Sequence, residues 1–272
     1  MKQQIVFLTG ASAGIGETTA RMLVDAGAVV YGASRRLAKA YQNQQSGGEF
    51  VPVQLDVNDE TQLESTVRRI VEERGYLNVV VANAGNGLAG SVEDASSDEV
   101  KYQFETNFFG VVKTIQACLP VFRNQGYGRV IAVSSVAAVI PIPYQAFYSS
   151  VKAALLMFMQ ALAIEIKPFH IQCSTILPGD TKTAFTSARK YSVKAEQLDS
   201  PYYQRMKISV GKMEKDEQNG MPPDKIAKAI VQQVFRKRMK TVVVPRIDYK
   251  LICLLGNWLP ARLKIWLVSK IY

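Results

Sequence analysis

The chain has 272 residues, 48% of them hydrophobic, and a formal net charge of +10. This length and apolar content can supply one or two α/β domains. The basic excess leaves nucleic acid, anionic lipid, phosphorylated ligands or a plainly solvated surface open as explanations. The single histidine, His170, argues against a His-based catalytic triad, and three dispersed cysteines without a CxxC pair support neither a disulfide framework nor a zinc site.

Targeting signals are not predicted. No apolar run is long enough to indicate a membrane-spanning helix, which needs about 20 residues. The apolar run that follows the first four residues has only the length of a strand, too short for the core of a signal peptide. Reduced thiols complete the expectation of a cytoplasmic protein.

Short apolar runs alternate along the chain with longer segments of helical spacing. Helices are predicted at residues 15–26, before Gly27, and at residues 63–74, before Gly75. Strands are predicted at residues 5–8, 29–33, 51–55, 78–82, 129–133, 171–177 and 241–244. This alternation predicts a parallel sheet with helices on both faces. Continuous apolar strands agree, because such strands are buried on both sides.

One long segment, residues 183–221, is polar and charged and looks least like core. It follows the sixth predicted strand and therefore starts at the carboxyl edge of the sheet, where open α/β folds bind ligands. Inserts of this length inside a compact domain are usually functional or disordered. We expect residues 183–221 to form a substrate-binding loop.

A glycine-rich turn with GxxxGxG spacing lies between the first strand and the first helix, at residues 9–16. Gly10 permits a tight turn, Gly14 lets the backbone approach a phosphate, and Gly16 permits close packing of helix on strand. The helix N-terminus then offers free N–H groups to a pyrophosphate. A plain structural turn is the alternative, but the βαβ pattern around the turn favours a dinucleotide.

The end of the second strand indicates which dinucleotide is bound. An acidic residue there usually meets a free ribose 2′-hydroxyl, and this chain has none. Ser34 and Arg35 instead offer a hydroxyl and a guanidinium that suit a 2′-phosphate, with Arg36 next in sequence. We therefore predict NADP(H) in preference to NAD(H). The alternative is that both arginines are solvated loop charges.

Tyr148 and Lys152 form the most informative pair in the chain. Their spacing of four places both side chains on one face of a predicted helix. A lysine ammonium beside a phenol favours the phenolate and lowers the tyrosine pKa from its free value of about 10. Such a tyrosine can protonate a carbonyl oxygen near neutral pH. Taken alone, the pair is equally compatible with an ordinary exposed helix surface.

Further motifs follow in a fixed order. They are residues 9–16, Leu55-Asp56-Val57, Asn83-Ala84-Gly85, Asn107 within Thr106-Asn107-Phe108-Phe109-Gly110, Ser134-Ser135, Tyr148 with Lys152, and Pro178-Gly179. In these features the chain resembles, over residues 4–245, the short-chain dehydrogenases/reductases that carry a GxxxGxG turn and a YxxxK pair. The resemblance implies a single-domain Rossmann fold with a doubly wound, seven-stranded parallel sheet, and a homodimer or homotetramer.

The resemblance also implies catalytic roles. Tyr148 would be the general acid in reduction and the base in the reverse direction. Lys152 would bind the nicotinamide ribose and lower the tyrosine pKa. Ser135 would hydrogen-bond the substrate carbonyl oxygen, and Asn107 would hold a water that links Lys152 to solvent. No metal is predicted.

A cofactor site follows from the turn, the second strand and the resemblance together. Asp56 and the Val57 amide would contact the adenine, and the Thr181 backbone and the Thr183 hydroxyl would contact the nicotinamide amide and the pyrophosphate. Ala13 departs from the pattern, because NADP-preferring relatives often carry a basic residue there. The predicted cofactor-binding residues are Gly10, Ser12, Ala13, Gly14, Ile15, Gly16, Ser34, Arg35, Arg36, Asp56, Val57, Asn83, Ala84, Gly85, Tyr148, Lys152, Pro178, Gly179, Thr181 and Thr183.

The C-terminal tail, residues 246–272, extends beyond the catalytic domain at residues 1–245. It is rich in large apolar residues, flanked by basic ones and interrupted near Pro260. One hypothesis is peripheral membrane attachment through two short amphipathic helices. The other is that the tail packs over the substrate-binding loop or a neighbouring subunit.

These observations predict an NADP(H)-dependent oxidoreductase that acts on the carbonyl or alcohol of a lipophilic small molecule. The apolar residues 139–144 and the tail favour a ketone or aldehyde that is steroid-like, retinoid-like or fatty. One alternative is reduction of 3-oxoacyl thioesters on an acyl carrier protein. Another, of a different class, is a non-catalytic NADP-binding sensor or scaffold. No nucleic-acid partner is predicted, because no basic-aromatic strip is present.

Overall fold

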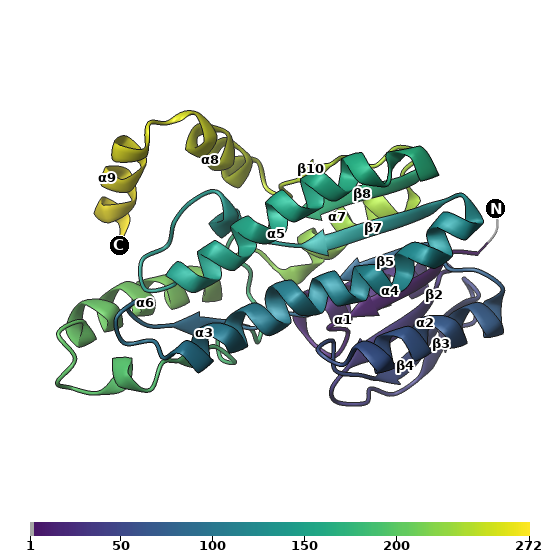
Figure 1. The fold of residues 1–272 in the computed structure, drawn as a ribbon, viewed down its shortest axis with the longest axis horizontal. Coiled ribbons are helices and arrows are strands. Elements are labelled where there is room, and N and C mark those ends of the chain that lie inside the picture. Colours follow the sequence, from purple (N-terminus) through teal and green to yellow (C-terminus); the bar gives the residue numbers. More distant parts are fainter. Residues whose placement is uncertain (1–2) are drawn as a thin grey trace.

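The computed structural model describes residues 3–272 and is built around one twisted sheet (Figure 1). Within these residues the sheet has eight strands in the order β10-β8-β7-β5-β1-β2-β4-β3. Its strands are β1 (Ile5–Thr9), β2 (Val29–Ser34), β3 (Tyr41–Asn43), β4 (Gly48–Gln54), β5 (Val79–Ala82), β7 (Gly128–Val133), β8 (Ile171–Ile176) and β10 (Val242–Val243). All strand pairs are parallel except β3 with β4.

Strand β1 lies at the centre, where Val6 pairs with Val30 of β2 on one side and Val79 of β5 on the other. The chain first builds outward through β2 and β4, then returns to β5 and continues through β7 and β8. The strand order therefore reverses beside β1, and a crevice forms at the carboxyl ends of the strands on either side of such a point. The two predicted ligand-binding motifs, after β1 and after β5, both lie there.

Helices cover both faces of the sheet (Figure 1). They are α1 (Gly14–Asp25), α2 (Glu60–Arg74), α3 (Ser97–Phe104), α4 (Gly110–Gln125), α5 (Ala146–Glu165), α6 (Tyr203–Gln218), α7 (Pro223–Phe235), α8 (Ile247–Trp258) and α9 (Ala261–Ile271). One hydrophobic core joins the sheet to α2, α4 and α5, and a second joins it to α1 and α7. The continuous apolar strands follow from this burial on both faces.

Helix ends coincide with residues that favour them. Asp59 caps α2, its carboxylate accepting from the Gln62 backbone N–H at 3.0 Å, and Gly75 ends the helix with a left-handed φ of 79°. Such caps satisfy backbone groups that have no partner within the helix. The described residues also contain a π-helical turn at Glu105–Phe109 and 3₁₀ turns at Val136–Ala138, Lys167–Phe169 and Lys194–Glu196.

The predicted doubly wound Rossmann fold is confirmed, but the predicted strand count is wrong. Among residues 3–272 the sheet has an eighth strand, β3, which is antiparallel and forms the edge. Its sequence, Tyr-Gln-Asn, lacks the apolar signal of a central strand because an edge strand is exposed. Strand β4 also starts earlier than expected, at Gly48, because a polar residue precedes its apolar part.

Helix α5 has the length and apolar composition of a membrane-spanning helix, with a mean hydropathy of 1.5. The sequence prediction of no such run is therefore incorrect for Ala146–Glu165. The packing of α5 accounts for its composition. Leu155 and Met159 are fully buried in the core on the sheet, and Lys152 lies buried on the same helix. A core helix passes the same length and composition test.

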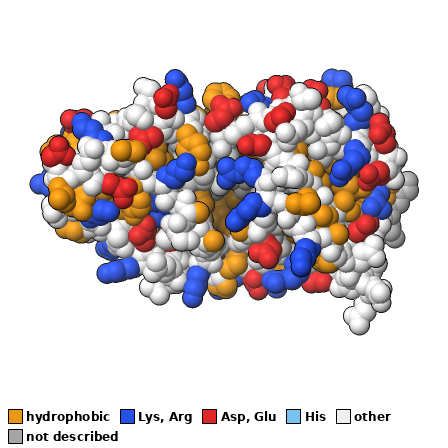
Figure 2. All heavy atoms as spheres, turned by 90° about the horizontal axis from the view of Figure 1, so that it is seen from below, with side chains coloured by type: hydrophobic (Ala, Val, Ile, Leu, Met, Phe, Trp, Pro, Cys, Tyr) orange, Lys and Arg blue, Asp and Glu red, His pale blue; other side chains and the backbone are white. Residues whose placement is uncertain are grey.

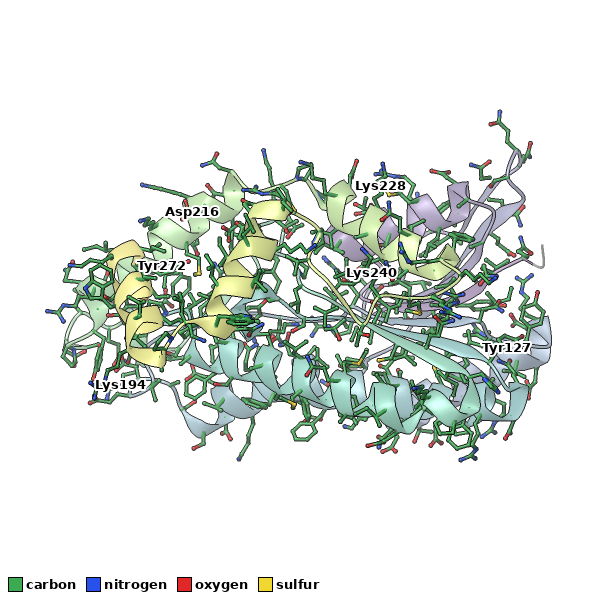
Figure 3. The ribbon with its side chains drawn as sticks, turned by 90° about the horizontal axis from the view of Figure 1, so that it is seen from above. Tyr127, Lys194, Asp216, Lys228, Lys240 and Tyr272 are labelled. Carbon is green, nitrogen blue, oxygen red and sulfur yellow. The ribbon has the colours of Figure 1, made fainter. Side chains whose placement is uncertain are left out.

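The segment at residues 183–221 is ordered into a small subdomain. Strands β6 (Leu88–Ala89) and β9 (Lys190–Tyr191) pair in parallel, and α6 follows. Met206, Val210 and Met213 of α6 form a third apolar core, and Tyr272 at the end of the tail packs against it. Figure 3 shows Tyr272 at the end of α9 beside α6. The tail therefore folds back toward residues 183–221.

Candidate active site

Tyr148 and Lys152 lie one turn apart on α5. The Lys152 Nζ is 5.7 Å from the centre of the Tyr148 ring. The lysine is 5% exposed, and its Nζ donates to the Val133 carbonyl at 3.1 Å. The Lys152 backbone carbonyl accepts from the Ser134 hydroxyl at 2.9 Å. The end of β7 thus positions both the side chain and the backbone of Lys152.

Ser135 lies two positions after the end of β7 and is the N-cap of the turn Val136–Ala138. Its Oγ accepts from the Ala137 N–H at 3.1 Å, and the Val136 N–H donates to the Pro178 carbonyl at 2.9 Å. One bond lies within the turn and the other joins it to the loop after β8, so both hold the start of the turn in place. The Ser135 hydroxyl reaches Tyr148 and lowers the pKa of that phenol. The predicted donor and the predicted acid therefore lie side by side.

Burial controls the pKa values of the pair. It raises the pKa of Tyr148 to about 12, with Ser135 acting in the opposite direction, and it lowers the pKa of Lys152 to about 8. Desolvation disfavours the charged form of each group, phenolate and ammonium alike. The expectation that Lys152 lowers the pKa of Tyr148 is not met in this structure, because the Nζ is directed at Val133.

Asn107 occupies the π-helical turn between α3 and α4 and is fully buried. Its Nδ2 donates to the Asn86 side chain at 2.7 Å and to the Gln103 carbonyl at 3.0 Å, and its Oδ1 accepts from the Asn86 N–H at 3.3 Å. π-Helical turns often occur at functional sites, because the extra residue re-aims a side chain. Here the turn points the Asn107 amide at the segment after β5.

Gly85 shows that Asn107 and Lys152 converge. A Cβ at Gly85 would lie 2.8 Å from Asn107 Oδ1 and 3.8 Å from Lys152 Nζ. Any side chain larger than hydrogen would therefore displace the amide. Asn107, Gly85, Lys152, Tyr148 and Ser135 together form one continuous group at the carboxyl ends of β5 and β7.

The glycine turn after β1 is tied to the segment after β5. The Asn83 Nδ2 donates to the carbonyls of Thr9 and Gly10 at 3.1 and 3.2 Å. The Thr9 hydroxyl accepts from the N–H groups of Asn83 and Ala84. Gly10 has φ of 71°, and a Cβ at Gly16 would lie 2.0 Å from the Gly10 carbonyl oxygen. The first and third glycines are therefore sterically required.

The N-terminus of α1 has the features of a phosphate site. In the part of the chain that the structure describes, no side chain caps this helix, whose N-cap is Ala13. Gly14 has φ of 55°, and a Cβ there would meet the Thr183 side chain at 3.2 Å. Open N–H groups and a bare backbone suit a pyrophosphate. Ser12 and Ile15 flank this backbone, so the residues present fit a dinucleotide.

The predicted adenosine end lies at the carboxyl ends of β2 and β4. Arg35 and Arg36 are exposed, but the Ser34 hydroxyl donates to the Arg36 carbonyl at 2.5 Å. Asp56 Oδ1 accepts from the Asn58 N–H at 3.0 Å. Val57 is buried, and its Cγ2 would lie 2.7 Å from a Cβ at Gly110. The guanidinium groups are thus free to meet an anion, whereas the Ser34 hydroxyl already has a partner.

The loop after β8 is held by the tail. The Tyr249 hydroxyl donates to the Asp180 carboxylate, and the Tyr249 ring lies where a Cβ at Gly179 would be. The Thr181 hydroxyl donates to the Gly179 carbonyl at 2.7 Å. The Thr183 side chain lies beside the glycine turn, where a Cβ at Gly14 would meet it. The Thr181 side chain instead hydrogen-bonds within its own loop.

Sequence reasoning missed an aromatic ring, Phe185, and a group of charged residues around Arg189, both near Tyr148. Phe185 lies with its ring centre 5.8 Å from that of Tyr148. The Arg189 side chain is fully buried and forms ion pairs with Glu217 and, at 3.4 Å, with Glu214. Both Arg189 and Glu217 affect the pKa of Tyr148. Asn86 was also missed, although its position directly after Asn83-Ala84-Gly85 could have indicated it.

A pocket of about 480 Å³ opens between the start of the substrate-binding loop and α6. It is lined by Lys182, Thr183, Thr186, Ser187, Glu214 and Gln218. Figure 2 views the molecule from below and shows a hollow near the middle of that surface. Hydrophobic side chains lie inside the hollow, and Lys or Arg side chains lie at its rim. A positive rim around a hollow favours anionic ligands.

Comparison with known proteins agrees with this geometry. The short chain dehydrogenase family matches residues 4–193. A 3-ketodihydrosphingosine reductase from Bacteroides thetaiotaomicron is 38% identical over 262 residues, which cover 96% of this chain and 94% of that protein. A short-chain dehydrogenase from Streptomyces avermitilis superposes with a TM-score of 0.76 at 25% identity, covering 95% of this chain and 96% of that one.

A short chain dehydrogenase/reductase from Burkholderia phymatum, solved in complex with NAD, has a TM-score of 0.78 at 17% identity and covers 93% of this chain and 92% of that one. At that identity it shows the fold alone. The family match and the relative at 38% identity extend over most of the chain. The chain therefore belongs to the short-chain dehydrogenase family of oxidoreductases.

Proposed function

We propose that this protein is an NADP(H)-dependent oxidoreductase that interconverts a ketone and an alcohol on a lipophilic small molecule. The observation that carries the proposal is the contact of the Ser135 hydroxyl with Tyr148 beside the buried Lys152. A nicotinamide cofactor would supply or accept the hydride. Solved relatives of the same fold include one in complex with NAD.

The protein residues supply the proton and the polar contacts. Negative charge grows on a carbonyl oxygen during reduction, so that oxygen needs a hydrogen-bond donor and a proton. Ser135 would donate the hydrogen bond, and Tyr148 would transfer its phenolic proton. A raised pKa keeps Tyr148 protonated at neutral pH, which suits an acid. Asn107 and Lys152 would complete the route by which the proton returns.

The cofactor preference is supported by the charges at the end of β2. Arg35 and Arg36 are exposed there, and the strand end offers no carboxylate to a ribose hydroxyl. Arginine side chains bind phosphate in a bidentate geometry. We therefore propose NADP(H) over NAD(H). We also propose that residues 1–245 form the catalytic domain and that residues 183–221 select the substrate.

A long-chain keto lipid is the substrate class that the site favours. The Phe185 ring packs beside Tyr148, and the apolar residues 139–144 are held to α5 by the bond from the Ile142 N–H to the Ser149 hydroxyl at 3.2 Å, so apolar side chains near Tyr148 would suit an alkyl chain. The relative at 38% identity is named for reduction of a keto group on dihydrosphingosine, a long-chain amino alcohol. Glu214 lines the adjacent pocket, where its carboxylate, already paired with Arg189, would also accept from an amino group near the ketone.

A homo-oligomer is supported by the outer face of α5. Met157 and Ile164 are exposed on it, and Phe109 is exposed at the start of α4. An apolar face on a helix of this length suits contact with a second copy. We propose a cytoplasmic homodimer through α4 and α5, with peripheral membrane contact through the tail.

The test is oxidation of NADPH and NADH against a panel of long-chain ketones, amino ketones, aldehydes and 3-oxoacyl thioesters. We expect turnover with NADPH and long-chain ketones, and none with Tyr148→Phe. Faster turnover of 3-oxoacyl thioesters than of any free ketone would replace the substrate class. Cofactor binding without turnover of any carbonyl compound would indicate a sensor instead of an enzyme.

A further inference from the structure

The tail exposes an unusual amount of apolar side chain. Helices α8 and α9 and the turn between them form an arch above the rest of the molecule (Figure 1). The large hydrophobic residues exposed on it are Ile247, Leu251, Ile252, Leu254, Leu255, Trp258, Leu263, Ile265, Trp266, Leu267 and Ile271. We call this set the tail face. Contiguous apolar surface of this kind marks an interaction site.

The inner side of the arch is fixed to the catalytic domain, so the tail face is held outward. Cys253 and Val268 are buried. Gly256 packs so closely on Ile140 that a Cβ would lie 2.5 Å from its side chain. The Lys264 Nζ donates to the Val139 carbonyl at 3.5 Å. Helices anchored on one side therefore present a defined outer surface, not a frayed end.

The far end of the tail has its own anchor. The Lys212 Nζ of α6 donates to the Ile271 carbonyl at 2.5 Å. Tyr272 packs into the α6 core, and burial raises its pKa to about 12. The arch is thus attached at α6, at residues 139–140 and, through Tyr249, at Asp180.

The charge of the tail selects one kind of partner. Lys250, Arg262 and Lys270 are exposed around the apolar residues. Asp248 is the only acidic residue of the tail, and it is already paired with Arg246. A second copy on this face would bring like charges together, whereas anionic lipid head groups would neutralise them. Helices with apolar side chains on one side and cations beside them lie in membrane interfaces.

Both tryptophans of the chain lie on the tail face. Trp258 is 82% exposed and Trp266 is 55% exposed. Tryptophan is enriched at the level of lipid head groups, because its ring is apolar and its N–H is polar. A soluble domain gains nothing by exposing a ring of this size to water.

We propose that the tail face binds the surface of an anionic lipid bilayer, with α8 and α9 lying in the plane of the membrane. This inference rests on the peripheral membrane contact proposed above and specifies its surface and lipid charge, but it does not depend on the proposed reaction, because it uses no catalytic residue. It also brings residues 139–140, which hold the tail and precede Tyr148 in the chain, close to the membrane surface.

The two tryptophans make the proposal directly measurable, because no other tryptophan contributes to the emission. The full chain is mixed with vesicles of phosphatidylcholine alone or with added phosphatidylglycerol. We expect a blue shift of emission and co-sedimentation with the anionic vesicles, both weakened by salt. The double substitution Leu254→Ser/Leu255→Ser keeps both tryptophans and should abolish co-sedimentation.

The matched control is Val92→Ser/Leu198→Ser, which removes two exposed apolar side chains outside the tail and should leave vesicle binding unchanged. Replacing Arg262 and Lys270 with Gln should weaken binding to anionic vesicles on the order of tenfold. Circular dichroism verifies that each variant is folded. Absence of a blue shift and of co-sedimentation at low salt would overturn the proposal. So would self-association of the wild type that Leu254→Ser/Leu255→Ser removes, because the partner is then a second copy.

Discussion

The sheet and the tail use the same apolar residue types in opposite ways. Val6, Val30 and Val79 lie side by side in the sheet with no exposed surface, whereas Leu254, Leu255 and Trp258 of the tail face solvent. In the sheet, burial creates a rigid frame that positions Ser135 after β7 and supports α5, the helix that carries Tyr148. In the tail, few apolar contacts are made with the protein. Hydrophobicity therefore supports folding in one region and supports recognition in the other.

The largest expected effect lies at the end of the sheet. Tyr148→Phe removes only the phenolic oxygen, so packing against Phe185 is kept while the proton donor is lost. We expect kcat to fall about 10³-fold, the scale of general acid catalysis. NADPH binding, followed by nicotinamide fluorescence, should stay near the wild-type value. A fall in kcat of less than about fivefold would remove Tyr148 from the chemistry.

A direct comparison of the two regions uses one substitution at two places. Leu155→Ala, at a fully buried position of α5, should lower the free energy of unfolding by about 2–5 kcal/mol. Leu254→Ala, at a position that is 56% exposed, should change it by less than about 0.5 kcal/mol. Urea unfolding measures both variants. Equal losses would mean that the tail is part of the folding core.

The pH dependence of stability tests the burial of Lys152. Burial lowers its pKa to about 8, from an ordinary value of 10.5, so the unfolded chain binds more protons between these values. Stability should therefore rise with pH across this window. Lys152→Met should remove that rise, so the wild type should gain about 2 kcal/mol relative to the variant between pH 7 and pH 10. Parallel curves for the two proteins would show that Lys152 is well solvated.

A smaller effect is expected at the exposed edge of the sheet. Arg35→Ala removes one guanidinium that would meet the 2′-phosphate of NADP(H). We expect KM for NADPH to rise about tenfold, the scale of one charge-assisted hydrogen bond, with KM for NADH almost unchanged. Leu37→Ala, at an exposed neighbouring position, is the control. An equal rise of both KM values would contradict the phosphate role.

The smallest expected effect is on substrate KM, at Glu214 of α6. Glu214→Gln keeps the shape of the side chain and removes its charge. We expect KM for a long-chain amino ketone to rise about fivefold, as for a partly exposed ion pair, with kcat unchanged. The same ketone without its amino group should show no change. A rise for both substrates would assign Glu214 to the structure of the loop.

Much of the fold was predictable because local patterns carry it. Continuous apolar runs indicated the seven parallel strands, and Gly27 and Gly75 indicated two helix ends. Strand β3 could not be predicted, because one tyrosine followed by two polar residues at an edge has no pattern of its own. Its pairing depends on β4, which supplies hydrogen bonds that the sequence of β3 does not reveal.

The candidate site likewise contains residues that the sequence predicted and residues that it did not. Ser135, Tyr148 and Lys152 each follow a recognisable element, so their proximity was expected from the order of the motifs. The ion pairs of Arg189 with Glu214 and Glu217 join residues 25 or more positions apart and carry no spacing signal. The direction of the Tyr148 pKa was also mispredicted, because spacing shows which groups are near but not how much water surrounds them.

The sequence by itself determined the alternation of strands and helices, the glycine turn and the candidate for the proton donor. These depend on residues close together in the chain. Only the tertiary structure decided the pKa values of Tyr148 and Lys152, the charged group at Arg189 and the side of the tail that faces outward. Each of these depends on desolvation by segments distant in sequence, and desolvation is set by packing in three dimensions.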